Sequence, residues 1–366
     1  MQAFTKCASG LLMAGVCMGL LYCHSNPEEE ALVQTRQLDA LLLQSGEQKL
    51  VAGGDGHSVA AVNNAVYAWG KNNRGQLGNN STTASNLPVP VATPAPTPFN
   101  GTLVAVEASG LASYAVTDTG QLFAWGSNEY GQLGVGGTSC SPYCTVPQPV
   151  AGIPGGVAAI SSRYHSVVAL DTGGNVWTWG LDDSNQLGYA TPAPVTCGGH
   201  SCQTTPVKLD NPTNVVAVSA GKSHSMALDD QGRIWSWGAN DCGQLGFSTT
   251  DTTCSLPSVT PIPCQSIPKQ VSGLGIIQAV AAGGSHSMAL DASQNVYSWG
   301  DNQYGQLGLG TANLNQATPT VISSLTGVIS VAAGGYHSMA IQGTDHSAWT
   351  WGSNSDPANP SPVVGQ

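Results

Sequence analysis

One pattern of eleven residues recurs along the chain and constrains its fold more than any other feature. It is AWGKNNRGQLG at 68–78, AWGSNEYGQLG at 124–134 and SWGDNQYGQLG at 298–308. Aromatic-x-Trp-Gly cores occur six times and hold all nine tryptophans, at 67–70, 123–126, 177–180, 235–238, 297–300 and 349–352. Successive Trp-Gly sites lie 56, 54, 58, 62 and 52 residues apart. Such a period indicates a repeat architecture in which each unit packs on its neighbours.

The unit at 214–246 predicts the secondary structure of one repeat. It contains three short apolar runs separated by turn residues, which indicates three strands. Trp235 and Trp237, two residues apart in the third run, face the same side of that strand. A Pro-Val segment, such as the one at 205–209, supplies a fourth strand. Four short antiparallel strands per unit predict the blade of a β-propeller.

The apolar side chains of the repeat explain why the blades must stack. A tryptophan buries about 150–250 Å², and a lone four-stranded sheet cannot bury both of its faces. Leucines of the Gly-Gln-Leu-Gly motif are expected to fill the seams between blades: Leu77, Leu133, Leu187, Leu245 and Leu307. Six Trp-Gly cores and six Pro-Val segments predict an all-β propeller of six four-stranded antiparallel blades over residues 46–366. The last Pro-Val segment, at 360–364, predicts that the C-terminal strand pairs with the first blade and closes the ring.

Two copies of the repeat carry a longer motif. They are GKSHSMALDDQGRIWSWGANDCGQLG at 221–246 and GGSHSMALDASQNVYSWGDNQYGQLG at 283–308. This pattern resembles the regulator of chromosome condensation repeat over about residues 48–364. The resemblance implies a β-propeller with partner-binding faces.

The chain departs from that family in several places. The family's best-known members have seven blades, whereas six are expected here. Ser113-Tyr114-Ala115 stands where His-Ser is expected, Asn185 replaces the first Gly of Gly-Gln-Leu-Gly, and the sixth repeat lacks that motif. The eukaryotic founders exchange nucleotide on a small GTPase and bind chromatin, but no basic tail or long wedge supports either role. Secreted bacterial members that inhibit β-lactamases imply that the propeller can act as a protein-binding surface alone.

The N-terminus predicts export. One Lys precedes an apolar run at 10–22, which is too short for a membrane span of about 20 residues and is typical of a secretion signal. The residues LLYC at 20–23 resemble the lipobox of bacterial lipoproteins, although Tyr22 stands where a small residue is expected. We therefore expect a signal peptide at 1–23, with lipidation of Cys23 as one outcome and an uncleaved anchor or nearby cleavage as others. Residues 24–45 are expected to form a tether with one short helix.

The charge of the chain bears on its partners. The net charge is −11, and no basic cluster offsets it. Such a surface repels phosphate backbones, so nucleic acid is excluded as a partner. Membrane contact is expected only through the N-terminal lipid anchor.

Five histidines are predicted to occupy the same position of the repeat: His57, His165, His224, His286 and His337. They could form a ring of metal ligands around the axis. The favoured interpretation is structural, with each histidine bonded to backbone at an inner turn, because functional sites usually break symmetry. His200 and His346 lie outside this series.

The cysteines beyond the signal fall mostly in pairs, each in a loop before a Pro-Val strand: Cys140 and Cys144, Cys197 and Cys202, and Cys254 and Cys264. In an exported protein this placement predicts three local disulfides. The segment CGGHSC at 197–202 could instead hold zinc with one further ligand. Cys242 remains as a buried or free thiol.

No catalytic motif stands out, and no metal or cofactor is expected. Asp182, Asp183, Asp241 and Asp301 follow Trp-Gly, where Asp favours turns. Loop tyrosines suit a protein-binding face, because tyrosine gives a large contact area at low entropic cost: Tyr130, Tyr143, Tyr189 and Tyr304. They could equally be packed loop anchors.

The sequence therefore predicts an exported, monomeric, non-enzymatic module that binds an unidentified protein through loops on one face. One alternative is a propeller hydrolase or lyase that uses the central funnel. Another is a glycan-binding module, which exposed tryptophans would support.

Overall fold

The computed structural model describes residues 50–92, 99–136, 140–189, 195–249, 262–343, 346–353 and 359–363. These residues form strands and loops, and no helix occurs among them. A search of the same residues finds no helix of the length and apolar character needed to span a membrane. The expected signal peptide at 1–23, the tether at 24–45 and Cys23 lie outside the described residues.

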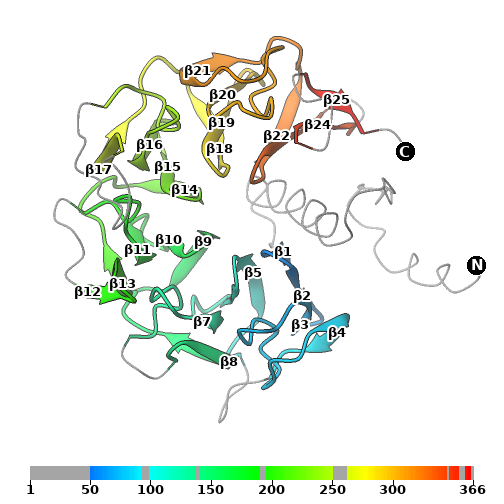
Figure 1. The fold of residues 1–366 in the computed structure, drawn as a ribbon, viewed down its shortest axis with the longest axis vertical. Helices are drawn as coiled ribbons and strands as arrows, with labels where there is room; N and C mark the ends of the chain where they lie inside the picture. The colour runs from blue at the N-terminus through cyan, green and yellow to red at the C-terminus, as the bar shows by residue number, and fades with distance from the viewer. Residues whose placement is uncertain are drawn as a thin grey trace, which may run out of the picture.

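Six antiparallel sheets surround a common centre as a six-bladed β-propeller (Figure 1). The first, innermost strands of blades 1 to 6 are β1 (Val51–Gly53), β5 (Leu103–Ser109), β9 (Val157–Arg163), β14 (Val215–Ala220), β18 (Ile277–Ala282) and β22 (Val328–Ala333). The second strands are β2 (His57–Val62), β6 (Ala112–Thr117), β10 (Ser166–Asp171), β15 (His224–Asp229), β19 (His286–Asp291) and β23 (His337–Gln342).

The aromatic-x-Trp-Gly cores form the third strands and the Pro-Val segments the fourth, as predicted. The third strands are β3 (Ala65–Gly70), β7 (Leu122–Ser127), β11 (Val176–Leu181), β16 (Ile234–Ala239), β20 (Val296–Gly300) and β24 (Ala348–Gly352). The outer, fourth strands are β4 (Ser85–Pro90), β8 (Tyr143–Val150), β13 (His200–Lys208), β17 (Cys264–Gln270), β21 (Gln316–Val321) and β25 (Ser361–Pro362). Blade 3 carries one further strand, β12 (Val195–Cys197), which pairs with β13.

The prediction that the C-terminal strand closes the ring by pairing with the first blade is wrong. β25 pairs with β24 of its own blade, through Thr350 with Ser361. The first blade already has its fourth strand, because β4 follows β3 directly and covers its outer edge. Pairing with the preceding strand closes a shorter loop than pairing across the ring, and it therefore costs less conformational entropy.

The repeated Trp and Gln residues bond neighbouring blades together. The Trp that precedes the core glycine is fully buried in blades 2 to 6, and its Nε1–H donates over 2.9 Å to a Gln carbonyl of the preceding blade. In blade 4, for example, Trp237 donates to Gln186 O, and the Ser225 hydroxyl donates to the same oxygen. These seam bonds satisfy polar groups that burial would otherwise leave unpaired.

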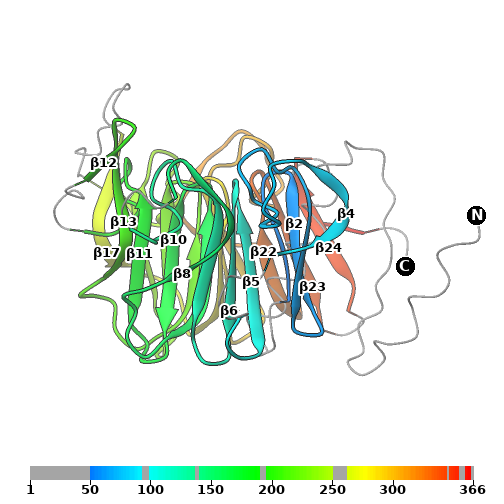
Figure 2. The same cartoon turned by 90° about the horizontal axis from the view of Figure 1, so that it is seen from below.

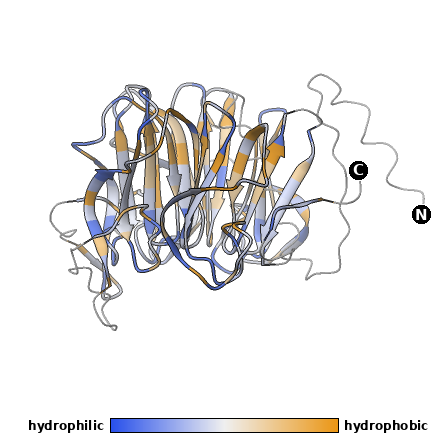
Figure 3. Ribbon diagram, turned by 90° about the horizontal axis from the view of Figure 1, so that it is seen from above, coloured by the Kyte–Doolittle hydropathy of each residue, from blue (hydrophilic) through white to orange (hydrophobic). Residues whose placement is uncertain are grey.

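The Gly-Gln-Leu-Gly loop has a separate function for each residue. In blade 4 the Gln244 amide oxygen accepts the Cys242 backbone N–H, while Asn240 accepts the Leu245 N–H. The five repeat leucines are fully buried, as predicted. Gly246 has φ of +80°, which strains any side-chain-bearing residue, and a Cβ there would come within 3.0 Å of the next blade's Trp299. Apolar residues accordingly concentrate on the strands and polar residues on the connecting loops (Figure 3).

Candidate partner-binding face

Two kinds of connection gather at one end of the propeller, which we name the loop face. They are the hairpins between the first and second strands and the long loops between the third and fourth strands. Antiparallel order places both kinds at the same end, and the hairpin of β12 and β13 projects there (Figure 2). The short turns between the second and third strands occupy the opposite end, the turn face.

The turn face is regular from blade to blade. Asp229 accepts the backbone N–H groups of Gln231 and Arg233 and the indole N–H of Trp235. Burial opposes ionisation of this carboxyl group, but the hydrogen bonds, led by that from Trp235, give it a lowered pKa. Asp171 and Asp291 stand in the same surroundings. Repetition of one arrangement indicates a structural role for these aspartates.

Three of the five predicted repeat histidines bond across seams. The Nε2 atoms of His57, His224 and His286 lie 2.8–2.9 Å from serine hydroxyls of the next blade, Ser113, Ser287 and Ser338. Burial lowers the pKa of His57 to about 4 and that of His224 to about 3, so both are neutral at pH 7. Backbone is the predicted partner, whereas these bonds are made to serine hydroxyls. Among the described residues, no group of three or more His, Cys, Asp or Glu residues could hold a metal ion.

The prediction that His165 shares the position of the other repeat histidines is wrong. That position pairs with the glycine of the Trp-Gly core, as His224 pairs with Gly238. In blade 3 the residue that pairs with the core glycine is Ser166, opposite Gly180, and His165 lies one residue earlier. One extra residue between His165 and the aspartate that ends the strand causes this displacement. A shift of one residue turns side chains to the opposite face of a strand.

Blade 2 also lacks the repeat histidine. From the sequence, Ser113 is expected at the histidine position, but the strand pairing places Ala112 there. Ala112 pairs with Gly126 of the core and therefore replaces the histidine, while Ser113 keeps the serine position. Blade 3 in turn lacks the serine, because the displaced register places Val167 opposite the core tryptophan. The seam between blades 2 and 3 therefore contains neither partner of the repeated histidine–serine bond.

Tyr114 compensates in that seam. It is buried and donates its hydroxyl over 2.8 Å to Gln132 O, which also accepts the Trp179 indole N–H. In the other seams described here, the second donor to the glutamine carbonyl is a serine hydroxyl. The tyrosine hydroxyl thus occupies the second lone pair of Gln132 O that the missing serine would use.

Blade 3 breaks the symmetry of the loop face. Its first hairpin is shorter than that of blade 4 and contains Tyr164, which has φ of +54°. Arg163 is buried, and its Nη2 donates over 2.7 Å to Ala333 O of blade 6, across the centre of the ring. His165 is only half-buried and lies beside Tyr130, with 4.5 Å between the ring centres.

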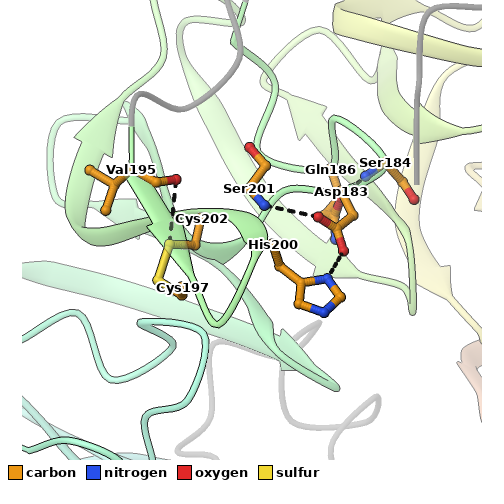
Figure 4. Close-up of polar contacts among 8 residues, drawn as sticks. All are labelled: Asp183, Ser184, Gln186, Val195, Cys197, His200, Ser201 and Cys202. Carbon is orange, nitrogen blue, oxygen red and sulfur yellow. Dashed lines mark hydrogen bonds and ion pairs between the residues drawn. A yellow bond between two sulfur atoms is a disulfide. The ribbon is translucent and has the colours of Figure 1, made fainter. Parts of the chain in front are cut away.

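A second histidine completes this cluster. His200, on the hairpin of β12 and β13, has its ring edge-on to Tyr130 at 5.3 Å. Its Nδ1 contacts the carboxylate of Asp183, which is buried and also accepts the Ser201 backbone N–H (Figure 4). The disulfide between Cys197 and Cys202 closes the same hairpin. Residues from two loops and two hairpins therefore converge at the junction of blades 2 and 3.

The four tyrosines expected on a binding face lie in four different environments. Tyr130 belongs to the histidine cluster, and Tyr304 packs against Tyr336 with 5.1 Å between ring centres. Tyr304 and Tyr336 are 41% and 47% exposed. Tyr189 turns inward, and its hydroxyl donates to Thr178 O. Tyr143 is half-buried at the start of β8.

Disulfides brace two of the long loops. Cys140 is joined to Cys144 and Cys197 to Cys202. Cys264 is also disulfide-bonded, while Cys254 lies outside the described residues. The pairing of Cys197 with Cys202 removes both thiolates that the alternative zinc site required. Cys242 is free, and burial followed by the nearby carboxylates of Asp241 and Asp301 raises the pKa of its thiol to about 12.

Sequence reasoning identifies Tyr130 and Tyr304 but misses their neighbours. Asp183 is predicted only as a turn residue, and His200 has no predicted partner. The signal for both is the histidine of the Cys-flanked segment at 197–202, which the other two Cys-flanked loops, at 140–144 and 254–264, lack. Tyr336 stands where other repeats have smaller residues, such as Ser223 and Ser285, and this also marks an exposed position.

The fold places this chain in the class of β-propellers built from sequence repeats. The features that differ from repeat to repeat lie on the loop face. The chain belongs to the RCC1-like domain family, whose model matches residues 15–358. It is 29% identical over 283 residues to the ultraviolet-B receptor UVR8 of Arabidopsis thaliana, which covers 76% of this chain and 58% of UVR8. It is 30% identical over 311 residues to the human E3 ubiquitin-protein ligase HERC2, which covers 83% of this chain and 6% of HERC2. The mitochondrial RCC1 domain-containing protein RUG3 of Arabidopsis thaliana is 32% identical over 309 residues, with 82% of this chain and 64% of RUG3 covered.

The chain therefore spans less than two thirds of the length of these relatives. Solved structures show the same fold. Human WBSCR16 superposes with a TM-score of 0.72 at 23% identity, covering 87% of this chain and 82% of that one. Prp20p of Saccharomyces cerevisiae superposes with a TM-score of 0.68 at 20% identity, covering 86% and 76%.

Proposed function

We propose that the chain is an exported, monomeric and non-enzymatic module that binds a protein partner through its loop face. The observation that carries the proposal is the edge-to-face pair of Tyr304 and Tyr336, each more than two fifths exposed. Large aromatic side chains held in one orientation bind partners at low entropic cost and dominate many interfaces. Leu314 is 66% exposed and lies in the long loop of blade 5, which also carries Tyr304, so it adds apolar surface to that loop.

The relatives support a binding role in general terms. Prp20p is described as binding Gsp1p and histones, and a second structure has the same protein bound to Kap60. Other relatives are named as a guanine nucleotide exchange factor and as ubiquitin ligases. Fold alone does not transfer those activities to this chain, because function depends on the particular residues of a site.

Photo-crosslinking of the full chain in cells that express it tests the proposal. Tyr304→Ala/Tyr336→Ala is expected to abolish a specific crosslinked protein that the wild type yields. Ile276→Ala is the matched control, because Ile276 is 67% exposed and lies beside the turn face. Crosslinks that survive the tyrosine changes, or that disappear equally in the control, would contradict the assignment to the loop face.

Export and anchoring need their own experiment. Labelling cells with a radioactive fatty acid is expected to mark the wild-type protein and to fail with Cys23→Ala. Cell fractionation then tests whether the chain resides in the envelope or in the medium. Recovery of the full-length protein in the cytoplasm would contradict export.

A further inference from the structure

Five of the six junctions between neighbouring blades are closely packed, and the junction between blade 6 and blade 1 is not. At the five packed junctions the inner strands lie side by side: β1 with β5, β5 with β9, β9 with β14, β14 with β18, and β18 with β22. Within the part of the chain that the structure describes, no strand of blade 6 packs against a strand of blade 1 to a comparable extent (Figure 1). The ring of blades is therefore open at this junction.

The buried apolar side chains are interrupted at the same place. They form five clusters, and each cluster joins two consecutive blades, from blades 1 and 2 to blades 5 and 6. No cluster of described residues joins blade 6 to blade 1. The sequence gives a reason, because the sixth repeat lacks the Gln-Leu pair whose leucine is buried in each of the other five repeats.

Trp69 of blade 1 differs from the tryptophans of the packed seams. It pairs with Ser58 as Trp299 pairs with Ser287, so the two tryptophans occupy the same repeat position. Trp299 is fully buried, and its indole N–H is bonded to the preceding blade. Trp69 is half-buried, and its indole makes no hydrogen bond to any residue that the structure describes. It therefore lies on a sheet face that no other blade covers.

We name the two blade faces at this junction the open seam. Six apolar side chains line it: Val51, Tyr67 and Trp69 of blade 1, and Met339, Ile341 and Ala348 of blade 6. In blade 5, the residues that correspond to those of blade 6 are Met288, Leu290 and Val296, and they pack against the next blade. Ile341 and Ala348 are half-buried, whereas Leu290 and Val296 are 2% and 0% exposed. A contiguous apolar surface of this kind indicates an occupant.

The segment that precedes β1 has the sequence of a helix. Asn26 is a favoured N-cap residue, and Pro27 suits the first helical position. Acidic residues at 28–30 suit the first turn, and Gly46 suits the position after the last turn. Neither Pro nor Gly occurs between these signals. The sequence therefore predicts a helix over residues 27–45.

The apolar residues of this predicted helix form two stripes. Ala31, Leu38 and Leu42 recur at helical spacing and would form the first stripe. Leu32 and Leu43 would form the second, about 100° round the helix axis from the first. One apolar stripe suits a helix that packs on a single sheet. Two stripes suit a helix that lies between two sheets, such as the faces of the open seam.

The length and the attachment of the segment also match the open seam. A helix over residues 27–45 would be about 28 Å long. The six-residue strands β2 and β23, which border the seam, are about 20 Å long. Residues 46–49 can span about 13 Å and lead directly into β1. Such a short connection gives an effective concentration on the order of millimolar, which favours this segment over a separate molecule.

We propose that residues 27–45 form a helix that inserts into the open seam and closes the ring of blades. Its leucines cover Trp69 on one side and Ile341 on the other. Only residues 24–26 then separate the helix from Cys23, so a lipid anchor there would hold the propeller close to the membrane without a long tether. The proposal is independent of binding through the loop face, because it concerns only the contacts of blades 6 and 1.

Photo-crosslinking from within the segment tests which molecule occupies the open seam. The full chain carries benzoylphenylalanine in place of Leu38 or, as the matched control, in place of Gln37 on the polar side of the predicted helix. The probe at position 38 is expected to crosslink to β1–β3 or β23–β24 of the same molecule, and the probe at position 37 is not. A covalent dimer, a crosslink to a different protein, or no crosslink to either blade would overturn the proposal.

Hydroxyl-radical oxidation, followed by mass spectrometry, tests whether the segment covers the seam. Leu42→Asp is expected to raise the oxidation rate of Trp69 about threefold, because an indole that loses its cover reacts faster. Gln44→Asp adds the same charge on the polar side and is expected to leave that rate unchanged. Trp299, fully buried in a packed seam, reports on the fold as a whole. Unchanged oxidation of Trp69 in Leu42→Asp, or an equal rise at Trp299, would contradict insertion.

A substitution on the propeller gives the reciprocal test. Ile341→Asp places a charge in the open seam and is expected to lower the yield of the crosslink from position 38 about threefold or more. Val321→Asp is the matched control, because Val321 is 43% exposed on β21, the outer strand of blade 5. Equal yields from the two variants would show that the segment lies elsewhere.

Discussion

In the seam between blades 4 and 5, removal of one hydroxyl oxygen, that of Ser287, interrupts a chain of hydrogen bonds. The Ser287 hydroxyl donates to Gln244 O over 2.8 Å and lies 2.9 Å from His224 Nε2. Because the hydroxyl proton is used toward Gln244, Ser287 must accept from the His224 Nε2–H. In Ser287→Ala, Gln244 O keeps the Trp299 indole N–H, but the fully buried His224 donor loses its acceptor. An unsatisfied buried donor costs about 1–3 kcal/mol, so we expect about 2 kcal/mol beyond the loss of the serine's own bond.

The seam between blades 3 and 4 supplies a matched control. Ser225 occupies the same repeat position, is fully buried and donates over 2.8 Å to Gln186 O, which keeps the Trp237 indole N–H. No histidine bonds to Ser225, because blade 3 has Ser166 in the histidine position. Ser225→Ala therefore removes the same atom and the same donated bond without orphaning a donor.

Equilibrium unfolding in urea at pH 7.5 compares the two variants. Ser225→Ala is expected to cost about 0.5–1.5 kcal/mol, the net value of one hydrogen bond, and Ser287→Ala about 2 kcal/mol more. Equal destabilisation by the two substitutions would refute the reasoning, because the loss would then come from the serine's own bond and packing alone.

Three further predictions concern stability. His57 is fully buried, and its pKa is about 4 in the folded chain against 6.5 in the unfolded chain. The free energy of unfolding is therefore unaffected by His57 protonation above pH 6.5 and falls by about 3 kcal/mol as the pH drops to 4, because the unfolded chain binds the proton first. The urea midpoints of the wild type and His57→Gln should converge over that range. Gly246→Ala adds a Cβ 3.0 Å from Trp299 at a φ of +80° and should cost about 2–4 kcal/mol in the same assay. Cys197→Ser/Cys202→Ser opens a short loop and should cost about 2 kcal/mol at most, with faster hydrogen exchange in β12 and β13 but not in β16.

The candidate site depended on the tertiary structure for a physical reason. Tyr130 could be singled out as a loop tyrosine, but its contacts with His165 and His200 join residues 35 and 70 positions away in the chain. Aligning blade 3 on its His-Ser pair places His165 in the repeat position, whereas aligning it on Asp171 places Ser166 there. Only pairing with β11 and packing against neighbouring side chains select the second register. Asp183 has the composition of a turn residue, so its role in orienting His200 had no sequence signal of its own.

The sequence by itself determined the period, the number of blades and the identity of their strands. Those properties follow from local patterns, because two-residue alternation and glycine turns act within a few residues. Contacts between strands in the folded chain decided that the last strand pairs with β24 and not, as the sequence had predicted, with the first blade. They also decided which histidines lie in the seams between blades. Both outcomes depend on competition for space between groups of different strands. The outer edge of β3 was already occupied by β4, and the space opposite the histidine position of blade 3 was already taken by Arg163.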